Sequence, residues 1–205
     1  MQLDDALRQI ADIRQHMVRS EVFRGCRAAT VAFSGAAGVA GALLQPYWVA
    51  APDSDLGRYL ALWVGIAATS LAIGGSEMFW RAWRAGPGLA REQTILLTQQ
   101  FLPSLVVGGL LTVCVARGAP NVAWMLPGLW SLLFGLGVFA AHRLLPRQIL
   151  WVGTFFVVCG FACLWWGRGA SVLSAWQMGI SFGGGQLLSA LVLYWNLERS
   201  DAPSP

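Results

Sequence analysis

One acidic side chain stands inside the apolar stretches of this chain, and it is the first candidate for chemistry. Glu77 comes four residues before Arg81, which begins a short polar loop. A carboxylate within a membrane span is costly and commonly serves the passage of a proton or a cation. Residues four apart on a helix also face each other, so Glu77 and Arg81 would equally form an ion pair at the membrane surface. The sequence leaves both interpretations open.

Amide and hydroxyl groups in two other apolar stretches form the second candidate. Gln99 and Gln100 precede Pro103, which has no N–H and therefore frees the carbonyl oxygen of Gln99. Ser104 adds a hydroxyl group beside this break. Gln186 follows three consecutive glycines, which weaken a helix locally.

These polar residues share a depth in the membrane. When each helix is counted from its arginine-rich end, Glu77, Gln99, Gln100, Pro103, Ser104 and Gln186 fall in the half nearer the cytoplasm. The hypothesis for a site is therefore a polar pocket that opens to the cytosol. The alternative is that the amides join helices to one another, with each hydrogen bond contributing about 0.6–2 kcal/mol.

Several kinds of chemistry are absent from the sequence. The basic residues are all arginine, and without lysine no Schiff base to a cofactor or substrate can form. The four cysteines show no zinc or redox spacing, and the two histidines, His16 and His142, fall on different elements. No catalytic triad, carboxylate pair, phosphate loop or metal cluster can be assembled, so we expect no catalytic residue, no metal and no cofactor.

Six apolar stretches supply the elements that must position these residues. They cover residues 28–51, 59–80, 94–116, 122–141, 148–167 and 171–197. A helix crosses a bilayer with about 20 residues, and each stretch supplies that number. The connections are short, so neighbouring helices must run antiparallel, which predicts three hairpins. Small residues four apart, such as Gly179 and Gly183 or Ser34 and Gly38, predict close contacts between helices.

The composition makes lipid the main solvent of the chain. Hydrophobic residues make up 56% and charged residues only 12% of the 205 residues, whereas a soluble domain is about 25% charged. Asp4 and Asp5 stand where a secretory signal would carry positive charge, and no apolar run precedes residue 28. The first apolar stretch is therefore expected to act as an uncleaved anchor.

Residues 1–27 form a separate region before the first span. Residues 2–24 read as an amphipathic helix, whose apolar stripe includes Leu3, Ile10, Ile13 and Met17. Arg14 and Arg19 lie mostly off this stripe. Such a helix would lie on the membrane with its arginines toward anionic headgroups, or it would dock a partner protein or a second copy of the chain.

The arginines predict the orientation. The N-terminal region, the second and fourth connections and the tail, residues 198–205, carry eleven arginines, against three on the opposite side. By the positive-inside rule both termini are cytoplasmic, in a multi-pass protein of the inner or plasma membrane. Topology and anionic lipids account for the arginines, so we expect no nucleic acid partner.

The sequence thus predicts an all-α integral membrane protein. Six transmembrane helices, residues 28–197, would follow an amphipathic N-terminal helix. Three functions are compatible with it. The favoured one is a non-enzymatic component that senses a signal or binds a partner. A transporter of small solutes or lipids, working through the polar pocket, is the alternative. A lipid-processing enzyme ranks last because the catalytic groups are missing.

Overall fold

Helices make up all of the regular secondary structure that the computed structural model describes. It describes residues 28–49, 55–84, 88–169 and 172–198, and these ranges contain no strand. The predicted amphipathic helix, with Leu3, Ile10, Ile13, Met17, Arg14 and Arg19, lies outside the described residues. The all-helical fold class is confirmed.

Among the described residues, five helical spans are long and apolar enough to cross a membrane. Their helices are α2 (Ala28–Trp48), α3 (Leu56–Arg84), α4 (Leu89–Gly118), α5 (Leu126–Ala141) and α6 (Ile149–Trp166). Two 3₁₀ turns, η1 (Pro120–Met125) and η2 (His142–Leu144), extend α5 at its two ends, and the fourth span, Pro120–Leu144, includes α5 and both turns. Each of the first five predicted stretches therefore overlaps one such helix, and α3 and α4 extend beyond theirs at both ends.

The last apolar stretch is helical but divided into four pieces. They are α7 (Ala175–Met178), the π-helix η4 (Gly179–Gly184), α8 (Gly185–Leu193) and the π-helix η5 (Tyr194–Glu198). The first π segment ends within the three consecutive glycines 183–185, which favour an ordinary helix least. π segments inside α-helices are rare and are found frequently at functional sites.

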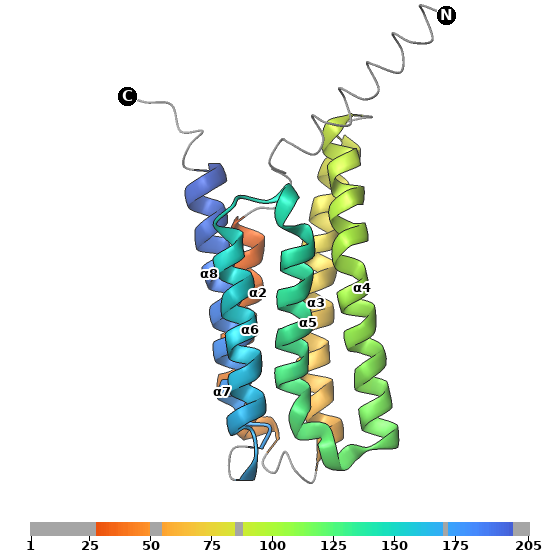
Figure 1. Ribbon diagram of the computed structural model, residues 1–205, viewed down its shortest axis with the longest axis vertical. Coiled ribbons are helices and arrows are strands. Elements are labelled where there is room, and N and C mark those ends of the chain that lie inside the picture. Colours follow the sequence, from red (N-terminus) through yellow and green to blue (C-terminus); the bar gives the residue numbers. More distant parts are fainter. Residues whose placement is uncertain (1–27, 50–54, 85–87, 170–171, 199–205) are drawn as a thin grey trace, which may run out of the picture.

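The helices lie side by side along the long axis of the molecule (Figure 1). α2 packs against α3 on one side and against η4 and α8 on the other, while α6 packs against α8 and α5. α4 packs against both α5 and α3, so the helices form a closed ring. We call the end at which α2 and α4 begin the upper end and the opposite end the lower end, as drawn in Figure 1.

Glycines bring the backbones of α5 and α6 into direct contact. A Cβ atom built on Gly128 would lie 2.8 Å from the carbonyl oxygen of Gly160, and one built on Gly160 would lie 2.9 Å from that of Gly128. Two turns farther along α5, a Cβ atom on Gly135 would lie 3.0 Å from the carbonyl oxygen of Gly153. Lipid offers no hydrophobic drive for helix association, so this close van der Waals contact supplies much of the attraction.

A second close contact joins the first and last apolar stretches. A Cβ atom on Gly38 of α2 would lie 3.0 Å from the Cα atom of Gly183 in η4. Gly179 meets Ala42 one turn away, where an added Cβ atom would approach to 2.6 Å. The predicted role of these small residues in helix contacts is confirmed.

Four phenylalanines fill the space between the helices that these glycines bring together. The ring of Phe134 on α5 lies 5.0 Å from that of Phe101 on α4 and 4.6 Å from that of Phe156 on α6. It also lies 5.6 Å from the ring of Phe182 on η4. Tilted and edge-on rings of this kind add to the energy of burial alone, so the cluster holds α4, α5, α6 and η4 together.

α3 and α4 are the least covered helices. In the most apolar window of each, only 11% of the residues are buried, against 33–44% in the other three spans. Both helices contribute to an apolar cluster near each end, with Met78 and Leu97 in the upper cluster and Leu60 and Val115 in the lower one. Long faces of both helices are therefore left free for contact with lipid or with another protein.

Candidate functional site

Glu77 is held by two neighbours at the upper end of the bundle. The hydroxyl group of Thr30 on α2 donates a hydrogen bond to Oε2 of Glu77. Nε of Arg81 lies 3.7 Å from Oε1 of the same carboxylate, one helical turn along α3. The carboxylate is partly exposed and joins α2 to α3, so the local ion pair that the sequence allowed is present together with a hydrogen bond between helices.

The two contacts of Glu77 predict unequal effects on stability. Arg81→Gln is expected to lower the free energy of unfolding by less than about 1 kcal/mol, because both partners are partly exposed. Thr30→Val should cost more, because it removes a hydrogen bond to a charged group and leaves Oε2 of Glu77 without a hydrogen bond at the contact of α2 with α3. Thermal unfolding of the purified variants in one detergent would measure both, and a larger loss in Arg81→Gln would contradict the ordering.

The two neighbouring glutamines of α4 face in different directions. Gln99 is exposed, and its amide makes no hydrogen bond to any other described residue. Gln100 is half-buried, and its Oε1 is enclosed by the protein without a hydrogen-bond partner among the described residues. Pro103 is exposed, whereas Ser104 faces α5, where its Cβ atom lies 3.2 Å from a Cβ position on Gly137.

The predicted pocket residues are not all on neighbouring helices. Gln186 is half-buried on α8, which packs against α2 and α6, whereas Gln99 and Gln100 lie on α4, which packs against α3 and α5. Glu77 and Gln100 do lie on adjacent helices, near the apolar cluster that includes Met78 and Leu97. A pocket made by all six residues stays a prediction, and the interface of α3 with α4 is its nearest structural counterpart.

A buried polar network lies at the lower end, where no site was predicted. Nε2 of Gln45 donates a hydrogen bond of 2.8 Å to the carbonyl oxygen of Leu173, and Oε1 of Gln45 accepts one of 2.8 Å from Nε1 of Trp63. All three residues are about 2% exposed. One amide thus joins α2, α3 and the loop before α7, and Leu173 has the uncommon backbone angle φ of 50° in that loop.

The sequence carried a weak signal for this network. Gln45 stands beside Pro46 near the end of an apolar stretch, where an amide is easily taken for an interfacial residue. Trp63 lies eighteen residues away on the next helix. The pairing depends on how α2 and α3 pack, so residue type alone could not identify it.

Two further polar groups lie in the lower half of the bundle. Nε1 of Trp130 on α5 donates a hydrogen bond of 2.8 Å to the hydroxyl group of Thr112 on α4. The hydroxyl group of Tyr59 is fully buried beside Trp63 and has no hydrogen-bond partner in the described part of the chain. These groups are buried among apolar side chains and join helices, an arrangement that favours structure over catalysis.

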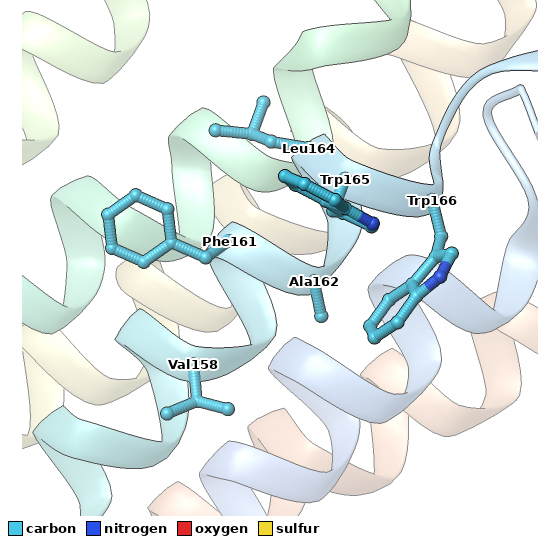
Figure 2. Close-up of a pocket in the computed structure, with 6 residues that line it drawn as sticks. All are labelled: Val158, Phe161, Ala162, Leu164, Trp165 and Trp166. Carbon is cyan, nitrogen blue, oxygen red and sulfur yellow. The ribbon is translucent and has the colours of Figure 1, made fainter.

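An open apolar groove of about 420 Å³ lies on one side of α6, and Figure 2 shows the residues that line it. Its lining consists of Val158, Phe161, Ala162, Leu164, Trp165 and Trp166. Trp165 and Trp166 are largely exposed at the end of the helix, which is the position of aromatic residues at a membrane surface. The groove offers almost no polar atom to orient a ligand, so it is suited to lipid chains.

These observations define an all-helical membrane protein whose interior polar groups mainly join helices. Within the ranges that the structure describes, no group of three or more histidine, cysteine or acidic side chains could hold a metal ion. No protein family model, curated protein or solved structure matches the chain. Any function must therefore be argued from the exposed and unpaired groups of the chain itself.

Proposed function

We propose that this protein is a non-enzymatic membrane component that binds a partner protein within the bilayer, through the outward face of α4. The observation that carries the proposal is the exposed amide of Gln99, which has no hydrogen-bond partner among the described residues. α4 has 30 residues, so its length is about 45 Å, and Gln99 lies about 15 Å from its upper end. This depth lies inside a hydrocarbon layer about 30 Å thick.

An amide at this depth needs a partner that lipid cannot supply. Burial of an amide in hydrocarbon without a hydrogen bond costs several kcal/mol. Exposed hydroxyl groups elsewhere in the spans avoid this cost locally, since Thr69 bonds to the carbonyl oxygen of Gly65 and Thr154 to that of Leu150. Gln99 makes no such bond. A helix of another protein would supply both a donor and an acceptor, and the weakly covered α3 and α4 leave room for it.

The proposal includes a topology of six spans, with residues 175–198 as the sixth. We further infer that the protein lies in the plasma membrane with both termini in the cytoplasm. We also infer that it has no nucleic acid partner. Arginines at the upper end support this orientation. Two of them lie over tryptophan rings, Arg84 over Trp80 at 4.0 Å and Arg91 over Trp83 at 4.5 Å, an arrangement suited to an anionic membrane surface.

Co-purification from native membranes tests the proposal. The tagged wild-type protein is expected to retain a specific membrane protein, and Gln99→Leu is expected to lose most of it, because leucine removes the amide but keeps the size and helical preference. Gln148→Leu, which also replaces an exposed glutamine, is the matched control. Retention of the same partners by Gln99→Leu and wild type would contradict the proposal.

One observation favours a transporter as the second candidate. Oε1 of Gln100 and the hydroxyl group of Ser70 are both enclosed without a hydrogen-bond partner among the described residues, on the adjacent helices α4 and α3. Unpaired polar groups that face a bundle interior are typical of a solute path. Gln100→Leu separates the two candidates, because it leaves the outward amide in place. A cellular phenotype from Gln100→Leu alone, with Gln99→Leu silent, would favour the transporter.

A further inference from the structure

The exposed face of α4 has a regular spacing. Exposed residues recur at alternating intervals of four and three: Ile95, Gln99, Leu102, Val106, Gly109 and Val113. Residues with this seven-residue repeat form a narrow seam along one side of a helix, where a second helix can wind around the first. The buried side of α4 carries Leu97 and Val115 instead, so the seam points away from the bundle.

The residue types along the seam favour a pair of parallel helices. At the first position of each repeat stand Gln99, Val106 and Val113, and at the second stand Ile95, Leu102 and Gly109. Gly109 has no side chain, so two helix backbones can approach closely at this point of the seam. A single polar residue at a first position fixes the register, which is the place of Gln99.

We infer that the occupant of this face is a second copy of this chain, in a parallel dimer whose two α4 helices meet along the seam. The inference rests on the proposed function, in which the face of α4 binds a protein. Two copies in one membrane share an orientation, so a two-fold axis along the membrane normal brings identical residues to the same depth. An amide both donates and accepts, and Gln99 is therefore complementary to Gln99 of the second copy.

Subunit counting in lipid vesicles tests the dimer. The full chain, labelled at its C-terminus, is reconstituted at several protein-to-lipid ratios, and photobleaching steps give the fraction of dimers. The wild type is expected to dimerise, Gln99→Leu to weaken the dimer on the order of tenfold, and Gln99→Asn to retain most of it, since an asparagine amide still pairs across the axis.

Two glycine variants distinguish a change at the seam between two copies from a change in the fold of one copy. Neither Gly109 on α4 nor Gly65 on α3 has any atom within 4 Å of an added Cβ position, so both accept a larger side chain within one copy. Gly109→Leu is expected to weaken the dimer at least as much as Gln99→Leu, because leucine keeps the two helices apart at the seam. Gly65→Leu should leave the dimer unchanged.

The possible outcomes distinguish a failure of the dimer from a failure of the proposed function. A wild-type protein that stays monomeric at every ratio overturns the dimer, and so does a dimer that Gln99→Leu and Gly109→Leu leave intact. If the monomeric protein still retains a different membrane protein that Gln99→Leu loses, the proposed function stands and only the identity of the partner is wrong. If it is monomeric and retains no partner, both fail.

Discussion

Replacement of Gly160 by leucine should prevent the bundle from folding. A Cβ atom at Gly160 would lie 2.9 Å from the carbonyl oxygen of Gly128 and 2.7 Å from Cγ of Leu132. The side chain of Leu132 can move, but the carbonyl oxygen belongs to the backbone of α5, so the two helices would have to separate. Overpacking of a well-filled core costs about 1–3 kcal/mol for a few methylene groups, and separation of a helix pair costs more.

The yield of monodisperse protein and its thermal unfolding in detergent measure this effect. Gly160→Leu is expected to give little folded protein, and Gly160→Ala to fold with a lowered midpoint, because a single methyl group already meets the carbonyl oxygen. Gly65→Leu is the matched control, since nothing lies within 4 Å of its added Cβ atom. A Gly160→Leu protein with the midpoint of the wild type would refute the close contact of α5 with α6.

The second large effect is expected from Gln45→Leu. Leucine fills a similar volume but removes both hydrogen bonds of the lower network, so the indole N–H of Trp63 and the carbonyl oxygen of Leu173 remain buried without a partner. Each buried group left unpaired costs about 1–3 kcal/mol. We therefore expect the free energy of unfolding to fall by about 2–6 kcal/mol, more than for either Thr30→Val or Arg81→Gln.

A double-mutant cycle isolates the contribution of this amide. Trp63→Phe removes the indole donor, so Gln45→Leu in that background should cost about 1 kcal/mol less than in the wild type. Gln148→Leu, at an exposed glutamine outside the network, controls for the loss of an amide as such. Equal costs of Gln45→Leu in the two backgrounds would show that the hydrogen bond from Trp63 contributes nothing.

Much of the helical fold follows from the sequence, because the thickness of a bilayer sets the length of a span. The predicted stretch 28–51 contains α2 (Ala28–Trp48), and 148–167 contains α6 (Ile149–Trp166). Helix ends were predicted less well. α3 continues to Arg84 and α4 begins at Leu89, since helices persist into polar segments that hydropathy assigns to loops.

Pairs of residues on one helix of the candidate site could also be predicted from the sequence, whereas contacts between helices could not. Glu77 and Arg81 stand at the spacing at which helical side chains meet, so their ion pair could be predicted. Thr30, the other partner of Glu77, lies 47 residues away. Nothing in residue type or spacing indicated that contact, because it depends on which faces of α2 and α3 pack together.

The sequence by itself determined that lipid is the solvent of this protein, that its apolar stretches are helical, and that few polar groups enter them. Only the tertiary structure decided which way those groups face. Consecutive residues of a helix point about 100° apart, so Gln99 and Gln100 cannot share an environment. Packing of α4 against α3 and α5 turns Gln100 toward the bundle and Gln99 away from it, because Leu97 and Phe101 occupy the contacts on that side.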